Sequence, residues 1–249
     1  MTMEKGSYHL LNVWLIFVGL LSFALVVCWD QGLLGALYEG DRSRISLLIL
    51  LLFALFFLHA ARRVLLLSQE LNRAVWLEEL MKEHPALSLR GRKLLIGGGI
   101  ELPDGFISDY IHDLLLSRSA ASTEEELKAS RADLLEVYSD RAKGPHEAGW
   151  FVVESIIKLG LLGTIVGFIM MLGSVAQTTT LDINAMQKVL QEMSVGMGTA
   201  LYTTLAGLAA SMVLAAEYHY LDRSADDLIA RTVRLTEVDI LPRLNGNQD

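Results

Sequence analysis

The sequence predicts an all-α fold, a polytopic membrane protein with four transmembrane helices and a helical cytoplasmic domain. Of its 249 residues 52% are hydrophobic, and the mean hydropathy is +0.39, whereas soluble domains average about 45 to 50% apolar residues. The excess is concentrated in four apolar runs, and each is long enough to cross the ~30 Å core of a bilayer as a helix. These runs cover residues 10–29, 45–61, 159–176 and 195–216.

The N-terminal run, Leu10 to Trp29, has 20 residues and no small-x-small cleavage site near its end. It is longer than the apolar core of a signal peptide, so it is predicted to be a retained first span. A short polar loop, Asp30 to Arg44, precedes the second run, Ile45 to Ala61. That run is rich in Leu and Phe and lacks a small-residue face, which predicts an outer helix that faces lipid.

The segment between the second and third spans is predicted to be mostly helical. A helix continues from the second span to about His84, where Pro85 stops it because proline cannot donate the helical hydrogen bond. Three consecutive glycines, Gly97, Gly98 and Gly99, indicate a loop. The dipeptide Gly144-Pro145 is predicted to break the chain before the third span.

Two helix starts are predicted inside this segment. Asp104 is the expected N-cap of the first helix, and Ser122 with Glu125 has the spacing of a capping box that opens the second. The apolar face of the first helix comprises Phe106, Ile107, Tyr110 and Leu114.

A further helix is predicted after the fourth span. Its apolar positions recur about every 3.5 residues, which favours packing against the bundle or a neighbouring subunit, with a plain amphipathic helix as the alternative. These positions are Leu221, Ala225, Leu228, Thr232 and Leu235.

The third and fourth spans differ from ordinary spans in the placing of their small residues. At 100° per residue, the small residues of each span fall within one narrow stripe of its helix. Such stripes let two helix backbones approach closely in lipid. The residues predicted to make this close packing are Gly160, Gly163, Gly167, Gly196 and Gly207.

Hydroxyl groups accompany these stripes at Thr164, Thr203 and Thr204. Polar groups inside a membrane usually face the bundle interior or a water-filled cavity, so the three threonines are candidate residues of an ion pathway. The alternative is that each hydroxyl bonds to a carbonyl of its own helix and only packs.

Glu154 and Lys158 lie one helical turn apart where the third span enters the membrane. They are candidates for a proton-entry or gating site. The alternative is an ordinary i,i+4 pair that partly neutralises itself.

The sequence carries no recognisable enzymatic, cofactor or metal site. The glycines Gly97 to Gly99 are not followed by Gly-Lys-Ser/Thr, which excludes a phosphate loop, and the six histidines have no metal-ligand spacing. The single cysteine, Cys28, has no partner within the chain for a disulfide. The net charge is −8 with acids and bases interspersed, so no basic face is expected to hold nucleic acid.

The third and fourth spans together resemble the pore-lining helices of the TolQ, ExbB and MotA family of proton-channel motor subunits. The strings that carry the resemblance are LGLLGTIVGF and GTALYTTLAGLAAS, and the similarity covers roughly residues 151–222. By position, Thr164 and Thr204 fall on the threonines of the family's two motifs. The chain departs from the family at Gly198 and Thr199, which replace Ala-Glu, and at Thr203, which adds a hydroxyl.

The resemblance implies a partner of the ExbD, TolR or MotB kind, a single-span protein with one intramembrane Asp. A proton path normally needs a titratable group at mid-depth, and residues 159–176 and 195–216 contain no acid. The partner would therefore supply it. The resemblance also implies a homo-oligomeric ring, expected to be a pentamer, that encloses the partner helices in the lipid bilayer.

Basic residues predict the orientation. They cluster after the second span, before the third and after the fourth, which places both termini and the long middle segment in the cytoplasm. Four spans match MotA, whereas the family description gives TolQ and ExbB three. We therefore expect a multi-pass protein of the bacterial inner membrane. Its parts are the first two spans (1–61), the cytoplasmic helical region (62–150), the pore-lining spans (151–216) and a C-terminal cytoplasmic helix and tail (217–249).

The predicted function is that of a proton-channel subunit in a rotary motor driven by the ion-motive force. The alternative is a non-conducting membrane scaffold or assembly protein, in which the small-residue stripes serve packing alone. An enzyme is disfavoured because the sequence offers no site. The choice of H⁺ or Na⁺ and the object that the motor moves stay open at this stage.

Overall fold

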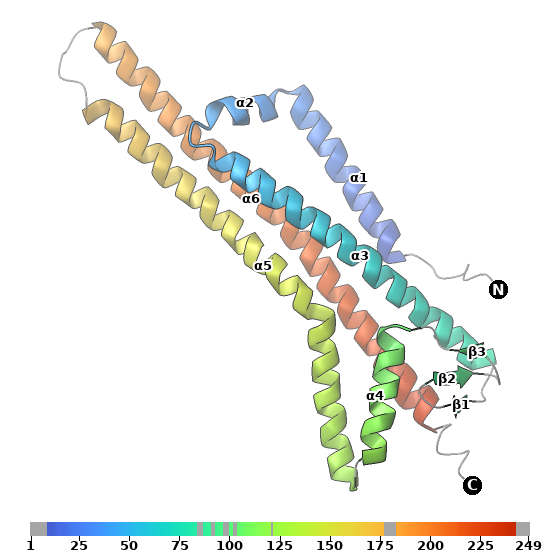
Figure 1. Cartoon of the computed structure of the whole chain (residues 1–249). Coiled ribbons are helices and arrows are strands. Elements are labelled where there is room, and N and C mark those ends of the chain that lie inside the picture. Colours follow the sequence, from blue (N-terminus) through green and yellow to red (C-terminus); the bar gives the residue numbers. More distant parts are fainter. Residues whose placement is uncertain are drawn as a thin grey trace. The chain divides into compact units, whose positions relative to one another are not determined.

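The computed structural model describes residues 9–83, 87–90, 93–96, 100–101, 104–120, 122–176 and 183–242 (Figure 1). Four of its helices are long and apolar enough to cross a membrane, which confirms the predicted all-α class. The helices are α1 (His9–Asp30), α2 (Leu33–Gly40), α3 (Ile45–Glu83), α4 (Phe106–Ala120), α5 (Glu124–Ala176), α6 (Ile183–Arg234) and a final π-helical segment, η1 (Leu235–Ile240).

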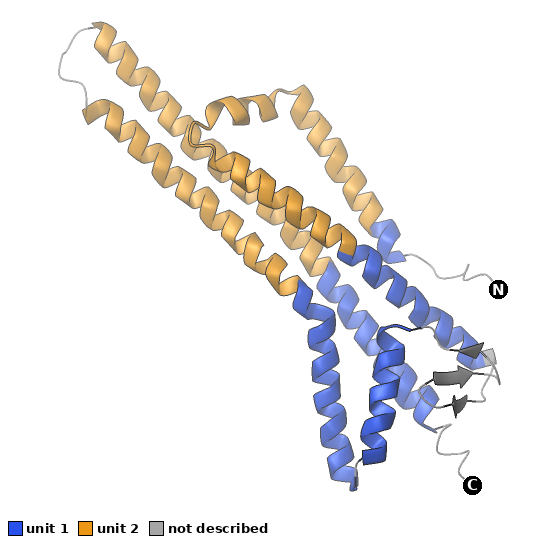
Figure 2. Cartoon of the chain, in the orientation of Figure 1, with its two compact units in different colours: residues 1–13, 63–145, 221–249 blue, residues 14–62, 146–220 orange. Residues whose placement is uncertain are grey.

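The chain forms two compact units (Figure 2). Unit 1 comprises residues 1–13, 63–145 and 221–249, and unit 2 comprises residues 14–62 and 146–220. Unit 2 therefore contains nearly all of the four apolar runs.

Large apolar side chains cover the outside of unit 2. On α1, Ile16, Leu20 and Phe23 are each about two-thirds exposed or more, and on α3 Leu51 and Leu55 are more than half exposed. Such a surface would be costly in water. The interior of a bilayer is as apolar as these side chains, so the cost would disappear there.

A short helix occupies the stretch predicted as a polar loop between the first two spans. Gly32, with φ of 71°, turns the chain in the left-handed region that glycine tolerates, and α2 follows directly. Asp41 then caps the start of α3, since its carboxylate accepts hydrogen bonds from Ser43 N at 2.9 Å and Ser46 N at 2.7 Å. The prediction of a loop was wrong because LLGALY is apolar and forms a helical turn at the end of a span.

The predicted break at Gly144-Pro145 was also wrong, because α5 runs through Pro145. Proline removes one backbone hydrogen bond from a helix interior. In the preceding turn, Arg63 Nη2 donates to the carbonyl oxygen of Ala142 at 2.9 Å. A side chain thus supplies a hydrogen bond in the turn that the proline weakens.

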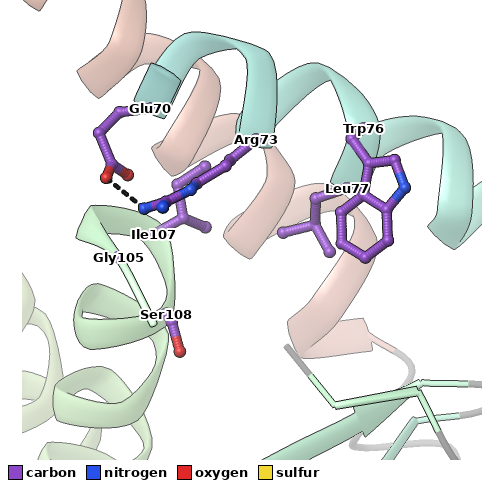
Figure 3. Close-up of a pocket in the computed structure, with 7 residues that line it drawn as sticks. All are labelled: Glu70, Arg73, Trp76, Leu77, Gly105, Ile107 and Ser108. Carbon is purple, nitrogen blue, oxygen red and sulfur yellow. Dashed lines mark hydrogen bonds and ion pairs between the residues drawn. The ribbon is translucent and has the colours of Figure 1, made fainter. Parts of the chain in front are cut away.

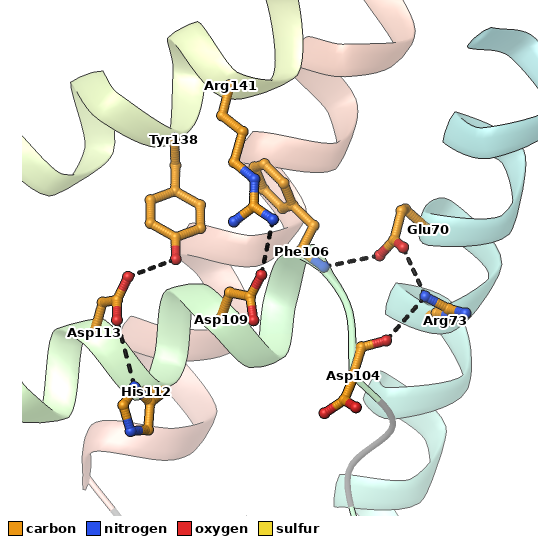
Figure 4. Close-up of polar contacts among 9 residues, drawn as sticks. All are labelled: Glu70, Arg73, Asp104, Phe106, Asp109, His112, Asp113, Tyr138 and Arg141. Carbon is orange, nitrogen blue, oxygen red and sulfur yellow. Dashed lines mark hydrogen bonds and ion pairs between the residues drawn. The ribbon is translucent and has the colours of Figure 1, made fainter. Parts of the chain in front are cut away.

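In unit 1, α4 packs through the predicted face of Phe106, Ile107, Tyr110 and Leu114, all of them buried. Its first backbone amide is capped by another helix and not by Asp104. Phe106 N donates to Glu70 Oε2 of α3 at 3.0 Å (Figure 4).

Arg73 supports this contact between α3 and the start of α4. Its guanidinium donates to Glu70 Oε1 at 2.7 Å and to the carbonyl oxygen of Asp104 at 3.0 Å. The adjacent pocket (Figure 3) has a volume of about 10 Å³, room for at most one water. The contact between α3 and the start of α4 is therefore structural, because the pocket beside it is too small for a ligand.

The predicted capping box is shifted by one residue. Thr123 Oγ1 accepts from Glu126 N at 3.2 Å, and Glu126 Oε2 accepts from Ser122 N at 2.9 Å. The capping residue is thus Thr123 in place of Ser122, and its partner is Glu126 in place of Glu125. Helix α5 therefore starts at Glu124.

A small antiparallel sheet lies between α3 and α4 in the chain. It consists of β1 (Leu87–Arg90), β2 (Lys93–Ile96) and β3 (Ile100–Glu101), in the order β1-β2-β3, with Leu87 opposite Ile96 and Leu95 opposite Glu101. In the sequence, LSLR and KLLI are two short runs separated by the two residues Gly91-Arg92. This spacing is typical of a β-hairpin, and the prediction of a mostly helical segment overlooked it. The loop predicted at Gly97 to Gly99 lies outside the described residues.

The helix predicted after the fourth span is the continuation of α6, followed by η1, and its predicted face is fully buried in unit 1. Leu221, Ala225, Leu228, Thr232 and Leu235 are each at most 1% exposed. The spacing of about 3.5 residues therefore marks a packing face within the chain itself.

Tyr138 joins α5 to α4. Its hydroxyl donates to Asp113 Oδ2 at 2.7 Å (Figure 4). Its ring packs edge-on against Phe106 and Tyr110. Burial raises the pKa of the Tyr138 phenol, and the bond to Asp113 raises it further. The phenol is therefore neutral and donates at physiological pH.

Tyr138→Phe is expected to lower the free energy of unfolding by about 1 to 2 kcal/mol, because Asp113 loses a buried donor. Since the folded pKa is raised, this contribution is present below pH ~10 and is lost as pH rises through the folded pKa. Thermal unfolding of detergent-solubilised protein at pH 7 measures it. The exposed Tyr38 is the control, and an equal effect of Tyr38→Phe would contradict the assignment.

Candidate ion-conducting site

Helices α5 and α6 of unit 2 contact each other through glycines, and we call this contact the α5–α6 seam. A Cβ atom added at Gly160 would lie 3.3 Å from Gly207 Cα, and one added at Gly207 would lie 3.0 Å from Gly160 Cα. At the other end, a Cβ at Gly167 would lie 2.6 Å from the carbonyl oxygen of Gly196. The two backbones thus touch at both ends of the seam, which only glycine permits.

Thr203 lies inside the seam. It is fully buried and faces Gly163, where an added Cβ would collide with its side chain. Its Oγ1 donates to the carbonyl oxygens of Thr199, at 2.9 Å, and Ala200, at 3.1 Å. Thr203 therefore fills the space that Gly163 leaves.

Thr204 is half-buried at the seam on α6, and Thr164, the residue after Gly163, is half-buried on α5. Thr164 Oγ1 donates to Leu161 O at 2.5 Å. Thr204 Oγ1 lies 3.0 Å from Ala200 O on its own helix and 3.4 Å from Gly160 O on α5. A hydroxyl has one donor and two acceptor lone pairs. Back-bonding uses the donor and leaves each oxygen able to accept a hydrogen bond from water or a protonated acid.

Glu154 and Lys158 form an ion pair on α5, with Lys158 Nζ 3.1 Å from Glu154 Oε2. Their side chains are 67% and 70% exposed. An exposed i,i+4 pair contributes little to stability. The arrangement leaves both charges accessible, and ten positions separate Glu154 from Thr164 on the helix.

The sequence model of the MotA/TolQ/ExbB proton channel family matches residues 108–233, about half of the chain. The chain belongs to this family. A search of the curated proteins found no match. The matched segment contains almost all of α4, all of α5 and all but the last residue of α6, so it includes every residue of the α5–α6 seam.

Members of the MotA/TolQ/ExbB family are channel and motor subunits of the bacterial inner membrane, not enzymes, and pair with proteins of the ExbD, TolR or MotB type. The chain is accordingly a multi-pass membrane protein of a proton-channel family. Among the described residues no group of three or more His, Cys, Asp or Glu side chains is placed to hold a metal ion.

Thr199 occupies the position where the family pattern has Glu, and the structure gives this departure a local role. Its Oγ1 donates to Gly40 O at 3.1 Å and accepts from Arg42 N at 3.3 Å. The residue is fully buried. Through these two bonds, the short hydroxyl side chain of Thr199 holds the end of α2 and the residues that follow it against α6.

A buried carboxylate that sequence reasoning missed lies one residue beyond the predicted fourth span. Glu217 is 3% exposed, and its Oε1 accepts from Trp14 Nε1 of α1 at 3.0 Å. Its Oε2 has no hydrogen-bond partner among the described residues. Thirteen positions separate Glu217 from Thr204, which corresponds to about 20 Å along the helix and a rotation of about 220°. Glu217 therefore holds α1 on the opposite side of α6 from Thr204.

Proposed function

We propose that the chain is the ion-conducting, ring-forming subunit of a rotary motor driven by the ion-motive force. Five copies enclose a single-span partner of the ExbD, TolR or MotB kind, and an intramembrane Asp of that partner carries the proton. Thr164 and Thr204 line the path, and Thr203 supports them from inside the α5–α6 seam.

The observation that carries this proposal is the pair of half-buried hydroxyls at Thr164 and Thr204, with acceptor capacity beside a backbone-to-backbone helix contact. Residues 159–176 and 195–216 hold no acid, and Glu217 lies on another face of α6. An acid on a partner helix would complete the path, because a threonine hydroxyl does not ionise at physiological pH and a proton path through a membrane normally needs a titratable group.

The orientation in this proposal follows from basic residues at the helix ends. Arg62 and Arg63 follow the second span, and Arg223 follows the fourth. By the positive-inside rule, both termini, the 62–150 segment and the C-terminal helix are then cytoplasmic. Glu154 and Lys158 would stand at the cytoplasmic entrance, where exposed charges can exchange protons with water.

The proposal is tested by proton flux into liposomes. The chain alone is expected to form a ring that conducts no protons, and addition of its single-span partner is expected to start conduction. A partner with Asp→Asn at the intramembrane acid should again conduct nothing. Robust flux through the chain alone would refute the need for a partner acid. Absence of flux with a co-purifying wild-type partner would favour the scaffold alternative.

A further inference from the structure

A cavity of about 760 Å³ lies within unit 2 between α1, α2 and α3. Its volume falls within the range of about 300 to 1,000 Å³ that is usual for small-molecule sites. The apolar part of its wall includes Trp29, Leu34, Leu47 and Leu50. These side chains belong to the end of α1, to α2 and to the first turns of α3.

Two arginines line the same cavity, Arg42 and Arg44. Both are exposed, and within the part of the chain that the structure describes neither guanidinium forms an ion pair. Asp41 also lines the cavity. Burial alone would raise the pKa of Asp41, but hydrogen bonds from Ser43 and Ser46 outweigh it and lower the pKa below its ordinary value.

The charges at the cavity therefore sum to one net positive charge. The Asp41 carboxylate is already occupied, because it accepts hydrogen bonds from Ser43 and Ser46 at 2.6 to 2.9 Å. The guanidinium donors of Arg42 and Arg44 have no acceptor among the described residues, and guanidinium matches the geometry of a phosphate.

The cavity lies where two spans end and begin, at Trp29 and Ile45. A tryptophan at such a place suits the headgroup level of a bilayer. An occupant must then present an anionic group to the arginines and an apolar body to the leucines. The surrounding membrane supplies a molecule of this kind.

We propose that this cavity binds an anionic phospholipid, with its phosphate on Arg42 and Arg44 and an acyl chain against Leu34, Leu47 and Leu50. None of the lining residues belongs to the α5–α6 seam, so the site is separate from the proposed ion pathway, although the backbone of Arg42 bonds to Thr199 of α6. The bound lipid would fill the space between α1 and α3.

Native mass spectrometry of the purified full-length chain tests the site, with phosphatidylglycerol and phosphatidylcholine of identical acyl chains as probes. The wild type is expected to retain phosphatidylglycerol about tenfold more tightly. Arg42→Gln with Arg44→Gln should reduce this preference to near unity. Arg62→Gln removes an exposed arginine at the other end of the same span and should leave the preference unchanged.

A second variant tests the cavity without changing charge. Gly35 lines the cavity, and a Cβ there would meet nothing within 4 Å. Gly35→Phe should therefore fold normally, occupy the space and reduce retention of both lipids. A photo-cross-linking side chain at Leu50 should give an adduct with the mass of one lipid.

Three results would overturn the proposal. The first is equal retention of the two lipids by the wild type. The second is loss of the preference in Arg62→Gln as much as in the double variant. The third is a Leu50 cross-link to a second copy of the chain, which would make the cavity a subunit contact.

Discussion

Gly167→Leu is expected to separate α5 from α6 and to prevent assembly of the ring. A Cβ at Gly167 would lie 2.6 Å from both Ala200 N and Gly196 O. These are backbone atoms of α6, so no side chain can rotate to make room. Packing in lipid depends on van der Waals contact, since lipid is as apolar as the helices. We expect a cost of about 3 kcal/mol, partly offset by the better helix propensity of leucine.

The matched control for this change is Gly173→Leu. Gly173 lies on the same helix, and a Cβ there would meet nothing within 4 Å. Size-exclusion chromatography after a heating series should show an apparent melting temperature about 5 °C or more below wild type for Gly167→Leu only. The apparent melting temperature of Gly167→Ala should fall between those of the two leucine variants. Equal behaviour of the two leucine variants would mean that the seam does not hold the helices together.

Thr164→Val and Thr204→Val are each expected to reduce ion-driven activity at least tenfold, while the ring and its partner complex still assemble. Valine keeps the shape of threonine but removes one donor and two acceptors. If water or the partner's acid uses the acceptor lone pairs of these hydroxyls, the path is interrupted. Partner co-purification and proton flux, measured on the same preparation, separate conduction from assembly.

Thr232→Val is the control for lost back-bonding. Thr232 Oγ1 donates to Leu228 O at 2.8 Å, the same i−4 bond that Thr204 makes to Ala200, but it lies in unit 1. One neutral intramolecular hydrogen bond contributes only about 1 kcal/mol net, and Thr232 lies outside the proposed pathway. The control should therefore leave flux unchanged. Full flux in the Thr164→Val, Thr204→Val double variant would exclude these hydroxyls from the pathway.

The spans and the seam glycines could be predicted from the sequence because both are recorded in local patterns. A run of apolar residues long enough for a bilayer needs no knowledge of its neighbours. The 3.6-residue period likewise places Gly160, Gly163 and Gly167 on one stripe of a helix before its partner is known. The C-terminal face from Leu221 to Leu235 was found in the same way.

Contacts between residues that are distant in sequence could not be predicted from local sequence patterns. Glu70 caps α4 across 36 positions, and Trp14 binds Glu217 across 203. The helical content of Leu33 to Gly40 was missed because a short helix between spans has too few residues for a periodic signal.

By itself the sequence determined which segments are long and apolar enough to span a membrane, which faces of the third and fourth spans carry the small residues, and to which family the motifs point. Only the tertiary structure decided that Thr203 is enclosed against Gly163 while Thr204, its neighbour, stays half-exposed. Adjacent residues differ by 100° on a helix. Which of the two faces a neighbour depends on where that neighbour lies, and this is a property of the packed helices that no local pattern records.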